Sequence, residues 1–147
     1  MMAAAEAGKR GRSVLVVDHA ATPGEKIRIS GGGRCNFTNV HTSPKNFLSA
    51  NPSFSISALK RYPASAFIAL VERYGIAYHE KALGQLFCDG SAAQIVAMLM
   101  TEMREAGAEL RLGTSAGRIR KTESGFSAVL SHDSRGSEPV ECTSLII

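Results

Sequence analysis

The feature that most restricts the possible fold is the start of the chain, where an Ala-rich helix pattern is followed by a short apolar strand pattern. Met2 to Arg10 holds mainly strong helix formers and has a basic end, and Gly8 and Gly11 predict where that helix stops. The segment 13–18, Ser-Val-Leu-Val-Val-Asp, is typical of a strand buried on both faces of a parallel sheet. Since such a helix ordinarily follows a strand, we expect an α/β fold with a parallel sheet whose leading strand is missing.

The rest of the chain divides into three segments with different local patterns. Residues 19–50 are rich in Pro and Gly and predict a loop around a short charged segment. Residues 51–106 predict helices at 57–62, 63–74 and 91–106, the last with Ser91 as N-cap, and short strands at 76–80 and 84–87. Residues 107–147 predict strands at 109–112, 115–121, 125–130, 139–142 and 144–147. We therefore expect residues 1–147 to form one partial domain, with a Rossmann-like part and a small β-meander.

Composition excludes several classes of protein. Hydrophobic residues make up 44% and charged residues 20% of the 147 residues, which fits a globular chain with a core. The longest apolar stretches are too short to cross a bilayer, so we expect no membrane partner. Cys35, Cys88 and Cys142 lie far apart without a Cys-x-x-Cys motif, so we predict neither disulfides nor a metal site and expect a reducing cytoplasm.

The distribution of charge bears on the partner. The chain has 17 Lys and Arg against 13 Asp and Glu, and the basic residues are scattered without a long run of like charge. The few aromatic residues are not interleaved with basic ones as they are in a base-stacking platform. We therefore expect a small organic molecule as substrate and no nucleic acid as partner.

Asp18 is the first candidate ligand-binding residue. In dinucleotide-binding folds the acid at the end of the second strand accepts hydrogen bonds from both ribose hydroxyls of the adenosine. An ordinary exposed acid at a strand end is the alternative. The Ala-rich helix and basic turn before this strand favour the ribose-binding interpretation.

The second candidate is the segment 30–36, Ser-Gly-Gly-Gly-Arg-Cys-Asn. Three residues without Cβ allow backbone N–H groups to approach a flat or anionic ligand closely, and the planar Arg34 side chain could contact phosphate or carbonyl oxygens. A flexible loop would show the same glycines. A nucleoside-triphosphate loop is excluded, because no Gly-Lys-Ser/Thr follows and no strand leads directly into the segment.

The segment 26–39, Lys-Ile-Arg-Ile-Ser-Gly-Gly-Gly-Arg-Cys-Asn-Phe-Thr-Asn, resembles the signature of a family of bacterial NAD(P)/FAD-dependent oxidoreductases. These are called aminoacetone-oxidase-like, YhiN-like or BaiN-like proteins, and the resemblance extends over essentially the whole chain. It implies an FAD-binding domain in which reduced nicotinamide delivers hydride to the flavin. It assigns no catalytic residue. The cofactor-binding residues that it implies are Asp18, Lys26, Ser30, Gly31, Gly32, Gly33, Arg34, Cys35, Asn36 and, through its backbone, Ala116.

Two departures from the family pattern affect what the chain is expected to do. The family's glycine-rich pyrophosphate turn should stand just before Met1, and further segments should follow Ile147. We therefore expect the chain to be a fragment that binds FAD weakly and is inactive by itself. Two other functions stay open on the residues alone: a non-catalytic module that binds nucleotide or RNA phosphate, and a reductase that uses NAD(P) without flavin.

Overall fold

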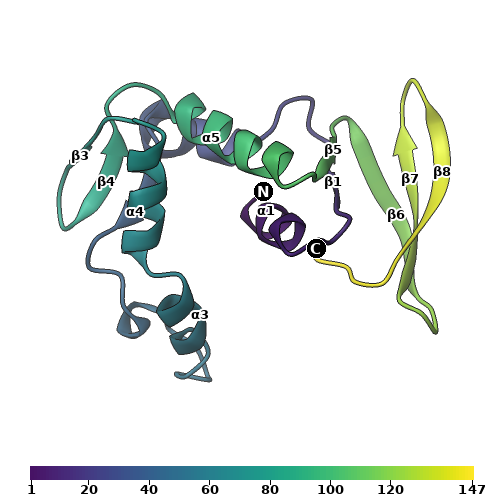
Figure 1. The fold of residues 1–147 in the computed structure, drawn as a ribbon, viewed down its shortest axis with the longest axis horizontal. Coiled ribbons are helices and arrows are strands. Elements are labelled where there is room, and N and C mark those ends of the chain that lie inside the picture. Colours follow the sequence, from purple (N-terminus) through teal and green to yellow (C-terminus); the bar gives the residue numbers. More distant parts are fainter. The chain divides into compact units, whose positions relative to one another are not determined.

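The computed structural model describes all residues from Met1 to Ile147, and the chain divides into two compact units (Figure 1). Unit 1 consists of Met1–Pro23 and Glu102–Ile147, and unit 2 consists of Gly24–Thr101. None of the helices is both long and apolar enough to span a membrane. The sequence-based division of one domain into four segments stays a prediction.

Unit 1 is built on a parallel pair of strands, as predicted. Strand β1 (Leu15–Val17) follows helix α1 (Met2–Lys9) and pairs in parallel with β5 (Glu109–Arg111), with Val16 opposite Leu110. The Asp18 N–H extends this ladder by donating to the carbonyl of Arg111 at 3.0 Å. The pair places the acid at position 18 directly at the carboxyl end of β1.

Strand β1 is less buried than the sequence indicated. Leu15 is 38% exposed, while Val16 and Val17 are only half-buried. The prediction of burial on both faces is therefore wrong for this structure. Side chains alternate between the two faces of a strand, so Val16 packs against the α1 core while Leu15 and Val17 point to the opposite face of a sheet only two strands wide.

The C-terminal part of unit 1 is an antiparallel meander. Strands β6 (Thr114–Lys121), β7 (Phe126–His132) and β8 (Gly136–Cys142) pair in sequence order. The predicted strand at 144–147 is wrong: the segment has no strand partner, and Ile147 is fully exposed. An apolar run predicts a strand only where a neighbouring strand can take its backbone hydrogen bonds.

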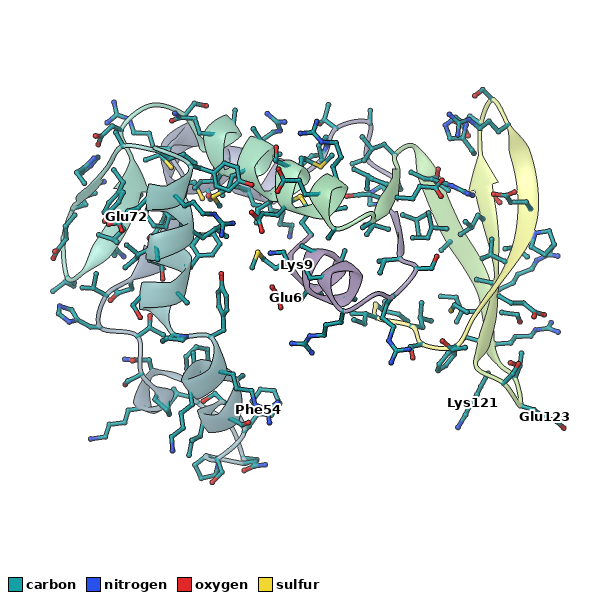
Figure 2. All side chains as sticks on the ribbon, in the orientation of Figure 1. Glu6, Lys9, Phe54, Glu72, Lys121 and Glu123 are labelled. Carbon is teal, nitrogen blue, oxygen red and sulfur yellow. The ribbon has the colours of Figure 1, made fainter.

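Helix α1 packs closely in unit 1. Ala4 and Ala5 form a small core with Met103, and partly buried side chains of both strands lie against it. Gly8 lies inside α1, so its predicted role as the helix stop is wrong; the helix ends at Lys9. An ion pair joins the Lys9 ammonium to the buried Glu102 carboxylate at 2.5 Å. Figure 2 shows the neighbouring side chains of Glu6 and Lys9 on this helix.

Replacing Gly8 with Ala should destabilise the chain although Ala is the better helix former. A Cβ at this position would lie 2.2 Å from the carbonyl oxygen of Ala106, which is a backbone atom that cannot swing away. Overpacking of this kind costs roughly 1–3 kcal/mol, which outweighs the gain of about 1 kcal/mol in helix propensity. Urea unfolding checks this. The control Ala3→Gly, on the exposed face of α1, should lose only about 1 kcal/mol. A Gly8→Ala chain as stable as the wild type would contradict this packing.

Unit 2 contains a three-stranded antiparallel sheet and most of the helices. Its elements, in chain order, are α2 (Glu25–Ile29), the 3-10 turn η1 (Ser30–Gly33), β2 (Asn36–Asn39), the 3-10 turn η2 (Pro44–Asn46), α3 (Ile56–Arg61), α4 (Ala64–Arg73), β3 (Tyr78–Glu80), β4 (Gln85–Cys88) and the first ten residues of α5 (Ala92–Glu105). Strand β4 lies between β2 and β3 in the sheet. The predicted helices and the strands at 76–80 and 84–87 are confirmed within a few residues. Strand β2 is new, because its sequence Asn-Phe-Thr-Asn carries no strand pattern.

Helix α5 supplies much of the buried surface of unit 2. Its buried side chains in this unit are Ala92, Ile95, Val96, Met98 and Leu99. The Ser91 hydroxyl accepts a hydrogen bond from the Ala93 N–H at 3.1 Å, so the predicted N-cap is confirmed. Because α5 is long and one-sided in polarity, the sequence predicted both of its ends to within one residue.

Candidate cofactor site

The three glycines form a tight turn with left-handed backbone. In η1, Gly31 has φ 58° and ψ 30°, and Gly32 has φ 67° and ψ 35°. The Cys35 N–H closes the turn by donating to the Ser30 carbonyl at 3.0 Å, and the Ser30 hydroxyl donates to the carbonyl of Ile27 at 2.8 Å. The sequence therefore produces a hydrogen-bonded turn here instead of a flexible loop.

Gly31 touches an aromatic ring that the sequence left without a role. A Cβ on Gly31 would lie 2.6 Å from Cε1 of Phe87 in β4 and 2.9 Å from the backbone nitrogen of Asn36. The ring of Phe87 is also stacked with His79, at 6.3 Å between centroids. Gly32, in contrast, faces open space on the side where a Cβ would stand. The turn thus packs against β4 through Gly31 and leaves the backbone of Gly32 accessible.

A hollow of about 300 Å³ lies beside this turn, entirely within unit 2. Four of the predicted site residues line it, namely Lys26, Ser30, Cys35 and Asn36. The rest of the lining is Ile27, Phe37, Phe67, Ile95 and Leu99. The hollow therefore combines an ammonium, a hydroxyl and an amide with an apolar wall, which is the usual composition of a site for a flat organic ligand.

The apolar half of this hollow was missed as a functional surface. Ile95 and Leu99 belong to the segment 91–106, which was predicted only as a helix, and Phe37 and Phe67 were not singled out at all. Their contribution depends on bringing α4, α5 and β2 together, which no local pattern indicates. Arg34 and the three glycines do not line the hollow, and Arg34 is an exposed neighbour of it.

Two thiols are buried under the turn. Cys35 is 5% exposed and Cys88 is fully buried, and the Cys88 N–H donates to the carbonyl of Arg34 at 2.9 Å. Burial, and secondarily negative charge on Cys35, raises the pKa of the Cys88 thiol to about 11. Burial also raises the pKa of Cys35, against an opposing hydrogen bond from Ser30. Cys35 is therefore a packed thiol, and Cys88 is its neighbour.

Thiol labelling should separate Cys142 from the other two cysteines. All three are reduced, but only Cys142 is exposed, so iodoacetamide at mildly alkaline pH should modify the native chain at Cys142 alone. Unfolding should expose the remaining two, and rapid labelling of native Cys88 would contradict this burial.

Because the pKa of Cys88 is higher in the folded state, the stability that this thiol contributes is complete below pH 9.0 and is lost as the pH rises to about 11. The loss should be roughly 2–3 kcal/mol.

The remaining two predicted residues lie in unit 1. The Asp18 carbonyl accepts from the Thr114 N–H at 3.0 Å, and its Oδ1 accepts from the Ala20 N–H at 3.0 Å. Oδ2 of Asp18 has no hydrogen-bond partner in the chain, and the side chain is 41% exposed. Ala116 is exposed on β6, opposite Leu130 of β7. Asp18 is therefore held by its backbone and one oxygen, while its second oxygen can accept hydrogen bonds from a ligand.

Comparison with known proteins identifies the family of the chain. Residues 1–147 match the sequence model of the HI0933-like protein Rossmann domain. The chain belongs to the HI0933-like family. It is 49% identical over 138 residues to the ribosomal RNA dihydrouridine synthase of Escherichia coli, covering 94% of this chain and 34% of that protein. The protein of the same name in Haemophilus influenzae is 47% identical over 123 residues, with coverage of 84% and 31%. This HI0933-like chain thus spans about a third of the length of these relatives.

Solved structures support the fold of the HI0933-like chain. THI4 of Thermovibrio ammonificans superimposes with a TM-score of 0.57 at 12% identity, covering 97% of this chain and 49% of that one. AlpK superimposes with a TM-score of 0.57 at 18% identity, covering 95% and 26%. With the family match, these similarities confirm the predicted α/β fold of the FAD/NAD(P)-binding Rossmann-like class, with a parallel pair and an antiparallel meander.

One prediction about partners is wrong. A small-molecule substrate without nucleic acid was expected, whereas both relatives are named for a reaction on ribosomal RNA. The error came from judging charge over the whole chain. Six of the 17 Lys and Arg lie between Glu25 and Glu72, and all 13 Asp and Glu lie outside that interval. Averaging over 147 residues conceals a long segment of one sign.

Proposed function

We propose that this HI0933-like chain is the FAD-binding part of a flavin-dependent reductase that converts uridine in ribosomal RNA to dihydrouridine. The observation that carries the flavin assignment is the hollow beside the Gly31–Gly33 turn, where polar side chains and an apolar wall meet. The substrate assignment is supported by the names of relatives at 49% and 47% identity. A cytoplasmic location is part of the proposal.

The reaction requires a two-electron reduction. Dihydrouridine differs from uridine by two hydrogens added across the C5–C6 double bond of the base, which amounts to one hydride and one proton. When bound, FAD would supply the hydride, and NADH or NADPH would reduce the flavin again. The chain's own residues bind and orient the cofactor and keep water from it.

The residues at the hollow suit a flavin. The apolar wall formed by Ile27, Phe37 and neighbouring side chains can cover an aromatic ring system, while the Asn36 amide can both donate and accept hydrogen bonds. The backbone of Gly32 is open to a ligand because no side chain shields it. Lys26 places a positive charge at the rim, where it would stabilise negative charge on a reduced flavin or on phosphate.

Asp18 suits the ribose of a dinucleotide. Its unpartnered Oδ2 can accept a hydrogen bond from a ribose hydroxyl, and its negative charge would repel a 2′-phosphate. The exposed Ala116 on β6 offers main-chain atoms to the adenine. Both assignments carry over from the family pattern by position.

Ribosomal RNA from cells with and without the gene tests the proposed reaction directly. The RNA is digested to nucleosides, and dihydrouridine is quantified by mass spectrometry. Loss of the gene should remove dihydrouridine from ribosomal RNA, and re-expression of the natural protein should restore it, whereas re-expression with Asp18→Asn should restore less. An unchanged dihydrouridine content after loss of the gene would overturn the substrate assignment and leave the flavin assignment standing.

A further inference from the structure

We infer an RNA-binding surface on unit 2, centred on helix α3 and its hollow, which shares no lining residue with the cofactor hollow. The inference rests on the proposed function, because it assigns the surface by which the RNA substrate is held. Helix α3 lies within the segment 26–71, which contains six Lys and Arg and no acidic residue; Lys26 and Arg34 of this segment are assigned to the cofactor, and Lys60 and Arg61 belong to α3. Cations without acidic residues nearby in the sequence favour a polyanion as ligand.

The cations at α3 are available to a ligand. Lys60 and Arg61 at the end of α3 are exposed, and neither forms a salt bridge within the chain. Lys60 and Arg61 line a hollow of about 450 Å³ together with Ser53, Ile56 and Ser57. Two hydroxyls and two cations around one concavity match the phosphate and sugar groups of a nucleic acid backbone.

Exposed aromatic rings accompany these cations. Phe54 is 75% exposed, Phe47 is 46% exposed and Tyr62 is 40% exposed, although aromatic rings of this size are ordinarily mostly buried. Figure 2 shows the Phe54 side chain beside α3, at the end of unit 2 where this helix lies. Solvent-exposed rings next to unpaired cations form the arrangement on which single-stranded bases stack.

RNA explains this surface better than a protein or a membrane. A protein partner would require a contiguous apolar face with few charges, whereas here two cations line the concavity itself. Each ring can stack on a base, and each cation can neutralise a phosphate, so one ligand uses both features. Binding of a membrane at α3 in place of RNA is one of the outcomes that the experiment distinguishes.

Binding of a short fluorescein-labelled single-stranded RNA to the 147-residue chain, followed by anisotropy over a range of salt concentrations, tests the inference. The double variant Lys60→Ala/Arg61→Ala should bind more weakly, and the slope of log affinity against log salt should fall by roughly 0.7 for each lost phosphate contact. The matched control Arg120→Ala/Lys121→Ala removes two exposed cations from β6 and should leave affinity and slope almost unchanged. Figure 2 places Lys121 near the tip of the β6–β7 hairpin.

The variant Phe54→Ala tests whether an exposed ring stacks on an RNA base. Loss of one stacked base should weaken binding by about tenfold with the salt slope unchanged, because stacking releases no counterions. The control Leu48→Ala removes an aliphatic side chain that is 97% exposed and should have little effect. Circular dichroism of each variant shows that the fold is retained.

The outcomes separate this inference from the proposed function. If RNA binding is equally weakened by the α3 pair and by the β6 pair, or if anionic vesicles bind at α3 while RNA does not, the inference is overturned. FAD titration of the same α3 variants should match the wild type. If the α3 variants keep RNA binding while loss of the gene removes dihydrouridine from ribosomal RNA, the proposed function stands and the assigned surface falls.

Discussion

Replacing Gly31 with Ala is expected to destabilise unit 2 by roughly 2–5 kcal/mol and to abolish measurable FAD binding. The added Cβ would meet the Phe87 ring at 2.6 Å and the Asn36 nitrogen at 2.9 Å, so that overpacking costs roughly 1–3 kcal/mol. Left-handed backbone at φ 58° adds roughly 1–2 kcal/mol for any residue with a Cβ. Urea unfolding and FAD fluorescence quenching measure the two effects.

Gly32→Ala is the matched control for this prediction. Gly32 has the same left-handed backbone, at φ 67°, but a Cβ there meets no atom within 4 Å. Its stability should fall only by the backbone cost of roughly 1–2 kcal/mol. FAD binding by Gly32→Ala should weaken more than its stability suggests, because the new methyl group covers main chain that is open to the ligand.

A second variant tests the contact behind the first prediction. Adding Phe87→Leu to Gly31→Ala shortens the side chain that blocks the Cβ, so the double variant should lose less stability than the sum of the two single changes. Strict additivity would show that the contact between Gly31 and Phe87 does not limit the turn. In that case the stability loss of Gly31→Ala would have to come from the backbone alone.

Asp18→Asn is expected to weaken FAD binding by roughly 10- to 150-fold. The Asn side chain keeps an oxygen that can accept from the Ala20 N–H, as Oδ1 of Asp18 does now at 3.0 Å, so the local turn survives. It removes the negative charge and replaces a ribose acceptor by an NH₂ donor, and a charge-assisted hydrogen bond is worth about 1.5–3 kcal/mol. Titration of the chain with FAD up to millimolar concentration measures the ratio of the two affinities.

The wild-type chain should itself bind FAD more weakly than micromolar. Asp18→Glu keeps the acid and should retain most of that affinity, whereas His19→Ala, at the exposed neighbouring position, should change it little. Equal affinity of the Asn variant and the wild type would show that the carboxylate does not hold the ribose. A complete lack of binding at millimolar FAD would contradict the cofactor assignment for the whole chain.

Local patterns predicted the elements whose burial is one-sided. The 91–106 helix was found because Ile95, Leu99 and Met103 repeat at helical spacing, and all three are buried. Strand β2 was not found, because Asn36–Asn39 is a strand through its hydrogen bonds to β4 and not through its own composition. The apolar run ending at Ile147 shows the converse error, since composition without a partner gave no strand.

The sequence predicted the part of the site that lies in one continuous motif, and it missed the part that other elements contribute. The glycine turn and its flanking polar residues form one continuous motif, so Lys26, Ser30 and Asn36 could be singled out together. Phe67 and Leu99 reach the same hollow from other elements, and only the fold brings them there. Cys88 likewise became a neighbour of the turn through the β2–β4 pairing. The acid-free segment was present in the sequence but was lost in the average over the chain.

The most direct test of the central claim is a two-dimensional ¹⁵N–¹H spectrum of the labelled chain during titration with FAD. The account predicts that amide signals of residues 26–37 shift progressively, together with those of Asp18 and Ala116, while signals of α3 stay in place. Shifts confined to α3 or to the β6–β8 meander beyond Ala116, or no shifts at millimolar FAD, would contradict it.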